Sequence, residues 1–199
     1  MRCLIPIACT VALLVASAPY AMAQQSTTDN SLVWRVSVGT GFTAPLDLED
    51  SRTLGLGARG SLTVGAPHSP LALRVDLFYE HFGLKDVTAG SNAIIGESAN
   101  ALWYVSTTRE HPRPYLVAGV GAAQIRTTVQ SGQISLQHGD YAFIFNAGAG
   151  LEIPVSSHAL FVEARVRGFR TSAYTWWKPD GSGADHYTWW VPVVVGVTF

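Results

Sequence analysis

Hydrophobic and polar residues alternate with a period of two along most of the chain beyond residue 30. This alternation is typical of β-strands, because successive side chains of a strand point to opposite faces. Short stretches that contain Gly, Pro or Asp separate the alternating segments, as turns and loops do. The pattern predicts eight strands, at residues 31–42, 53–64, 71–80, 96–105, 115–126, 141–153, 159–169 and 189–199.

The two faces of these strands differ in charge. One face is apolar and uncharged, apart from Glu97 if that face extends to the end of the strand at 96–105. For the strand at 115–126, a run of Gly and Ala leaves the assignment of the faces open. On the other strands the second face is rich in Gly and carries the charged residues Arg35, Arg59, Arg74, Asp76, Glu80, Glu152, Glu163, Arg165 and Arg167.

This distribution is the reverse of a water-soluble sandwich, which turns its charged face outward and packs its apolar faces together. An outward apolar band around a polar interior is typical of a transmembrane β-barrel, whose closure leaves no strand edge unpaired in lipid. We therefore predict an all-β fold, an eight-stranded antiparallel up-and-down transmembrane β-barrel with a polar, filled interior. Because eight strands enclose a space that side chains can fill, we expect the inward charges to form a buried neutral network.

The first residues have the features of a secretory signal peptide. Arg2 precedes an apolar stretch, and Ala21-Met22-Ala23 fits a cleavage site. We predict a signal peptide at 1–23, a short periplasmic lead-in at 24–30 and a barrel domain at 31–199. Both cysteines, Cys3 and Cys9, fall in the signal peptide, so the exported chain has no thiol chemistry. Export of a barrel places it in the outer membrane of a Gram-negative bacterium.

The composition agrees with contact to lipid. Charged residues make up 14% of the chain, against about 25% in an average soluble protein. Without Arg2 the chain has 12 basic and 14 acidic residues, a net charge of −2, which gives no support for nucleic-acid binding. No run of 18 apolar residues follows the signal peptide, so the sequence predicts no transmembrane helix.

Longer and shorter connections alternate between the predicted strands. Outer-membrane barrels have long extracellular loops and short periplasmic turns, so both chain ends should be periplasmic. The shorter connections contain Gly65-Ala66-Pro67, Pro112-Arg113-Pro114 and Pro154. The predicted surface loops are residues 43–53, 83–95, 127–140 and 170–187.

The last strand keeps its alternation to the final residue. Trp189 would mark the outer membrane interface and Phe199 the periplasmic one, with valines between them in lipid. Pro192 interrupts this strand, and we expect either a bulge there or a position whose N–H has no ladder partner.

Three stretches resemble a known family, the small outer-membrane barrels that include OmpX-like proteins, opacity proteins and the OmpA transmembrane domain. These stretches are PYLVAGVGAAQI (114–125), FNAGAGLEIPVSSHALFVEARVRGF (145–169) and the terminal VPVVVGVTF. The resemblance covers nearly the whole mature chain and implies an architecture, not an activity. It implies a monomer surrounded by outer-membrane lipid and lipopolysaccharide. It also implies a signal for the barrel-assembly machinery, formed by Val191, Val193, Val195, Val197 and Phe199.

Histidines and aromatic residues are the candidates for binding. His68, His111 and His158 fall on the periplasmic side, and His81, His138 and His186 on the outer side. Three histidines on one rim could bind a metal, but we favour their exclusion from hydrocarbon and expect no cofactor. The repeated YTWW motif supplies either an interfacial belt or a contact for an unknown surface ligand, through Tyr174, Trp176, Trp177, Tyr187 and Trp189.

The function we expect is structural and interactive: support of the outer membrane and presentation of surface loops. Two alternatives remain open. One is a lipid A-modifying enzyme, although no deacylase or palmitoyltransferase motif is visible; its candidate residues would be His81, Glu97, Ser98, His138, Asp185 and His186. The other is a narrow conduit for ions or small molecules.

Overall fold

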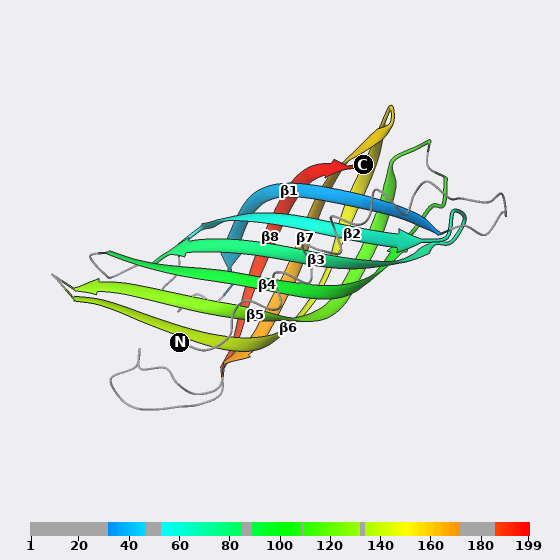
Figure 1. The fold of residues 1–199 in the computed structure, drawn as a ribbon. Coiled ribbons are helices and arrows are strands. Elements are labelled where there is room, and N and C mark those ends of the chain that lie inside the picture. Colours follow the sequence, from blue (N-terminus) through cyan, green and yellow to red (C-terminus); the bar gives the residue numbers. More distant parts are fainter. Residues whose placement is uncertain (1–31, 47–52, 85–88, 109, 132–133, 172–185) are drawn as a thin grey trace, which may run out of the picture. The chain divides into compact units, whose positions relative to one another are not determined.

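A computed structural model describes residues 32–46, 53–84, 89–108, 110–131, 134–171 and 186–199. The predicted signal peptide and lead-in lie outside these residues. Eight strands pair in chain order, every pair is antiparallel, and β8 also pairs with β1 (Figure 1). This confirms the predicted eight-stranded up-and-down barrel. The strands are β1 (Val33–Pro45), β2 (Gly55–Gly65), β3 (Leu71–Gly83), β4 (Ala89–Tyr104), β5 (Arg113–Ser131), β6 (Ile134–Val155), β7 (His158–Thr171) and β8 (His186–Thr198).

The strand register fixes how wide the barrel is. A path of paired residues that leaves β1 at Arg35 returns to β1 at Pro45, ten residues further along. It passes through Thr63, Arg74, Asn100, Gly119, Asn146, Arg167 and Trp190. A stagger of this size tilts eight strands by about 40° and leaves an interior that side chains can fill. No helix in the described residues is long and apolar enough to cross a membrane.

The predicted faces of the strands are confirmed. Leu73 on β3 and Val195 on β8 are more than half exposed on the outside, whereas Asp76 and Glu163 are 0% and 1% exposed inside. On β5, where the sequence left the faces open, Tyr115 and the alternate residues after it point inward.

The interior is layered, not uniformly polar. We call the end of the barrel with the β2–β3, β4–β5 and β6–β7 connections the turn end, and the opposite end the loop end. Apolar side chains fill the interior near the loop end, and a smaller apolar cluster lies near the turn end. The first cluster comprises Phe78, Phe82, Ile94, Ala123, Ile125, Ala142, Ile144, Phe169 and Trp190. The second comprises Ala72, Leu102, Tyr104, Tyr115 and Val117.

Two of the predicted surface loops are wrong in extent. Much of 83–95 is strand, because β4 begins at Ala89, and nearly all of 127–140 is strand, because β5 runs to Ser131 and β6 starts at Ile134. The β5–β6 hairpin continues its backbone hydrogen bonding well beyond the apolar band, where Thr and Val side chains also favour strands. Length alternation between connections is therefore a poor guide to the two ends of this barrel.

Pro192 does not produce a bulge. The same β7–β8 register holds on both sides of it, but the ladder lacks pairs between Ala164–Val193 and Arg167–Trp190. Of the two outcomes expected from the sequence, the structure shows the interrupted ladder. On its other side, Pro192 keeps its place opposite Thr43 of β1.

Glycine permits the close approach of β1 and β8, which lie side by side in Figure 1. A Cβ atom added to Gly41 would lie 1.8 Å from the carbonyl oxygen of Val193, and one added to Gly196 would lie 2.2 Å from that of Val38. These contacts are with backbone, which cannot move aside without breaking the ladder. The closing seam of the barrel therefore requires glycine at these positions.

We predict that Gly41→Val prevents the barrel from closing, whereas Gly60→Val does not. A Cβ atom at Gly60 would meet no atom within 4 Å, so it serves as a matched control. The overpacking at Gly41 should cost about 1–3 kcal/mol or more. The measurement is the fraction of folded protein after refolding in detergent, read from the mobility difference between heated and unheated samples. Equal folded fractions for the two variants would contradict the steric role of Gly41.

Candidate functional site

The centre of the barrel holds an ion-pair group around Glu163 of β7. Its two carboxylate oxygens accept four hydrogen bonds from four inward side chains. Arg74 and Tyr115 donate to one oxygen at 2.8 and 2.7 Å. Arg165 donates to the other at 2.5 Å, and Arg59 donates to the same oxygen. A carboxylate has about four acceptor positions, so Glu163 is fully occupied.

Asp76 of β3 extends this central group. It lies 3.0 Å from the Arg74 Nε and 2.7 Å from an Arg165 nitrogen, and it accepts a hydrogen bond from Asn100 at 3.0 Å. Arg74 and Arg165 therefore each contact both acids, Asp76 and Glu163. The group ties together strands on opposite sides of the barrel wall, because β2, β3, β4, β5 and β7 all contribute to it.

A second ion-pair group lies near the turn end, around Glu152 of β6. Arg35 donates to both of its carboxylate oxygens, at 2.7 and 2.9 Å, and Arg113 also pairs with it. Tyr104 accepts a hydrogen bond from Arg35 at 2.6 Å, and the Arg113 guanidinium lies 4.5 Å from the centre of the Tyr104 ring. Both arginines are thus held by an acid and an aromatic ring.

A third group lies between the central group and the loop-end apolar cluster. Glu80 of β3 pairs with Arg167 of β7 at 2.5 Å and accepts a hydrogen bond from the Trp190 indole N–H. The Arg167 guanidinium stacks 3.8 Å from the centre of the Phe78 ring. This group links the polar middle of the interior to its apolar end.

The structure brings together every charged residue predicted for the interior. It also adds Arg113 and the polar partners Tyr115 and Trp190, which the sequence analysis missed. Arg113 lies two residues before Tyr115 and therefore on the same face of β5. The alternation would have predicted that Arg113 points inward if the faces of β5 could have been assigned from the sequence.

The expectation of a neutral network is wrong for the described side chains. Six inward arginines face four inward acids. The nine residues predicted from the sequence already comprise five arginines and four acids, and Arg113 raises the excess from one to two. The arginines are Arg35, Arg59, Arg74, Arg113, Arg165 and Arg167, and the acids are Asp76, Glu80, Glu152 and Glu163.

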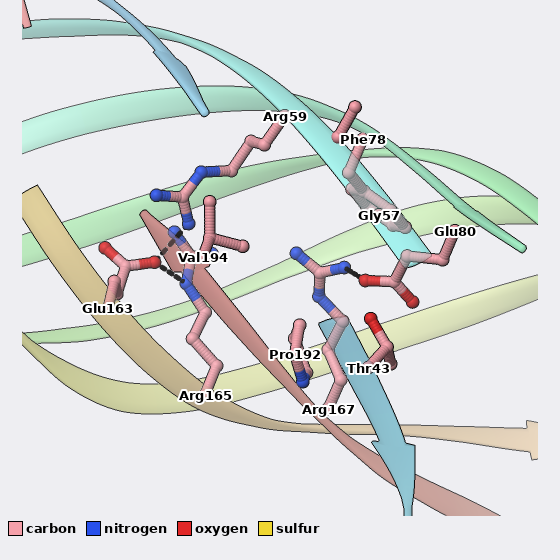
Figure 2. A pocket seen from close by; sticks show the side chains of 11 residues that line it. Thr43, Gly57, Arg59, Phe78, Glu80, Glu163, Arg165, Arg167, Pro192 and Val194 are labelled. Atoms are coloured by element: carbon pink, nitrogen blue, oxygen red, sulfur yellow. Dashed lines mark hydrogen bonds and ion pairs between the residues drawn. The ribbon is translucent and has the colours of Figure 1, made fainter. Parts of the chain in front are cut away.

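Two small cavities separate the ion-pair groups. Each is about 10 Å³, which is close to the space required by one water molecule. One lies between the central group and Glu80, with Arg59 and Arg167 along its wall (Figure 2). The other lies between the central group and Glu152, beside Tyr104 and Tyr115.

The residues considered for lipid A chemistry do not converge where the structure describes them. His81 and Glu97 are on the outer wall, whereas Ser98 is buried inside. Asp185 and the side chains of His138 and His186 lie outside the described part of the chain.

The described histidines do not form a metal site. His68 and His111 lie in separate connections at the turn end, and the His158 ring packs 5.0 Å from that of Phe199. Within the described ranges, no three His, Cys, Asp or Glu side chains are grouped closely enough to hold a metal ion.

The outward aromatic residues of β8 pack on the barrel wall. The ring centres of Tyr187 and Trp189 lie 6.2 and 5.0 Å from that of Phe145 on β6. Tyr174, Trp176 and Trp177 fall outside the described residues. Phe199 is exposed at the turn end, and the alternate valines of β8 from Val191 to Val197 share its outward face.

Comparisons with solved structures show which fold this is. The chain is similar to Neisserial surface protein A, with 14% identity and a TM-score of 0.59 over 84% of this chain and 97% of that one. It is similar to a major outer membrane protein from Thermus thermophilus, with 13% identity and a TM-score of 0.60 over 85% and 99%. It is also similar to Ail of Yersinia pestis, with 11% identity and a TM-score of 0.51 over 85% and 99%.

These likenesses confirm the predicted resemblance at the level of the fold, which is that of the small eight-stranded outer-membrane barrels. No protein-family model matches the sequence, and comparison with curated proteins gave no match.

We predict that Glu163→Gln lowers the free energy of unfolding by about 3–5 kcal/mol, because it leaves three buried guanidinium groups around a neutral amide. Ser37→Ala is the control, since it removes one neutral hydrogen bond to Thr198, which is worth about 1 kcal/mol. Both values would come from urea titration of the refolded barrel. A loss for Glu163→Gln no larger than that for Ser37→Ala would show that the central group does not depend on this carboxylate.

Proposed function

We propose that the chain is an outer-membrane β-barrel whose outer wall contacts lipid. The observation that carries this proposal is the apolar outer wall of a closed barrel. Among the strand residues whose side chains the structure describes, the charged ones that face outward are Glu97 and, towards the loop end, Arg126. Water would leave most of this apolar surface unfavourably exposed, whereas lipid would cover it.

Aromatic side chains support a bilayer of ordinary thickness around the barrel. Trp34, Trp103 and Phe199 are exposed on the outer wall near the turn end, and Tyr79 and Trp189 nearer the loop end. On β8, Trp189 and Phe199 are ten residues apart, which spans about 25 Å along the axis of a tilted strand. That matches the roughly 25 Å apolar band of outer-membrane barrels.

We propose a structural and surface-interaction role, not transport. The turn end would face the periplasm, the loop end would present a surface to an unknown ligand, and lipopolysaccharide would surround the wall. The strand that ends at Phe199 would serve the barrel-assembly machinery as its signal. The filled interior supports this role, because ion pairs and two apolar clusters occupy the space of a pore.

We predict that Val195→Arg, in the middle of the lipid-facing part of β8, destabilises the barrel in phospholipid vesicles by about 2–4 kcal/mol. Val155→Arg, at the turn end of β6, should cost about 0–1 kcal/mol, because an arginine there reaches the interface. Both parent valines are about half exposed on the outer wall, at 54% and 49%. Folding free energies in vesicles provide the measurement.

Equal, small effects of the two substitutions would mean that water bathes the wall.

In cells, the same proposal requires the protein to sediment with outer membranes and to need detergent for release. A freely soluble protein after fractionation would contradict it.

We predict that the refolded barrel gives no conductance steps in a planar bilayer. Apolar side chains at the loop end, Phe82 and Ile94 among them, are fully buried and block hydrated ions. Insertion would be verified independently by resistance of the barrel to protease. Reproducible steps from verified, inserted protein would instead support the narrow conduit.

A further inference from the structure

The cavity between the central group and Glu80 is lined by hydrogen-bond donors that lack acceptors. Three of its lining residues, Thr43, Arg59 and Arg167, are 1%, 5% and 2% exposed. The Thr43 hydroxyl, the Arg59 Nε and Nη2 and the Arg167 Nε have no hydrogen-bond partner. Figure 2 shows these residues around the cavity, with Arg59 on one side of Val194 and Arg167 and Thr43 on the other. Buried donors of this kind are costly unless something accepts from them.

The two acids that line the cavity, Glu80 and Glu163, do not supply the missing acceptors. The four acceptor positions of Glu163 are filled by Arg59, Arg74, Arg165 and Tyr115. Glu80 forms an ion pair with Arg167, accepts a hydrogen bond from the Trp190 indole and makes a further interaction. The occupant must therefore bring its own lone pairs.

The size and charge of the cavity restrict the occupant. About 10 Å³ admits a single non-hydrogen atom. A water molecule accepts about two hydrogen bonds and must donate two, whereas the surrounding groups offer mainly donors. A monatomic anion accepts from all of them and donates none. It would also compensate part of the excess of inward arginines over inward acids, and buried unpaired charge is strongly unfavourable.

We propose that this cavity binds one halide ion, with chloride as the physiological form, held by Arg59, Arg167 and Thr43. The site is independent of the proposed lipid contact, because it depends only on the interior of the folded barrel. Gly57 is part of the site: a Cβ atom there would lie 3.5 Å from the Thr43 hydroxyl and 3.3 Å from Glu80, so glycine keeps the cavity open.

The solution test measures the thermal unfolding midpoint of the intact barrel in detergent, in sodium chloride and in sodium gluconate of equal concentration. We expect a saturable rise with chloride, because a ligand that binds only the folded state stabilises it. Thr43→Val removes one donor and should raise the half-saturating chloride concentration about tenfold. Ser61→Ala is the matched control, since the Ser61 hydroxyl is also buried and unpartnered but does not line the cavity.

The absence of any chloride dependence would overturn the proposal, because it would mean that water occupies the cavity. A chloride dependence that is unchanged in Thr43→Val would also overturn it, because it would reflect a general effect of salt on the solvent. Crystals grown with bromide give a second readout. An anomalous peak among Arg59, Arg167 and Thr43 would support the site, and a bromide-free cavity in well-ordered crystals would overturn it.

Discussion

Closure of eight strands with a stagger of ten residues is the constraint on which the rest of the structure depends. It makes the interior so narrow that inward side chains from opposite walls touch. Glu163 on β7 reaches Arg59 on β2 and Arg74 on β3 across this space. Where no room remains, as at Gly41 and Gly196, the wall contains glycine. Charge pairing and glycine placement are two consequences of the same geometry.

The buried ion pairs make the register specific more than they make the barrel stable. Removing charges from water costs about as much as their pairing returns, so the net gain from these groups is modest. A slip of one strand by one residue, however, would turn its inward charges onto the outer wall and its valines into the interior. Because Glu163 and Asp76 share Arg74 and Arg165, such a slip would leave several charges unpaired at once.

Period-two alternation was sufficient to predict the strand number, the closed barrel and the inward charges listed from the sequence, because successive residues of a strand belong to opposite faces. It failed where side chains carry little information. The Gly and Ala residues of β5 left the direction of Arg113 unassigned, and with it one of the two excess positive charges of the interior. The extent of β5 and β6 was missed because backbone pairing continues where the apolar signal has ended. The pairing of each arginine with its acid depends on the stagger between strands around the barrel. The pattern of a single strand does not contain this stagger.

Glu97 shows how the proposed bilayer constrains the outer wall. It lies on the outward face of β4, six residues from Trp103, or about 15 Å along the barrel axis. That depth is within an apolar band of about 25 Å. Arg126, which also faces outward, lies four pairs further towards the loop end than Ala122, the partner of Glu97.

An acid costs less than an arginine on the lipid face, and the cost of arginine falls towards the interface. The described side chains of the wall follow this rule. Arg126 is near the loop end, and the charge at depth, Glu97, is acidic. The other arginines whose side chains are described in the strands point inward. The outer wall and the interior therefore obey one principle, that a guanidinium is placed only where an acid, an aromatic ring or water can reach it.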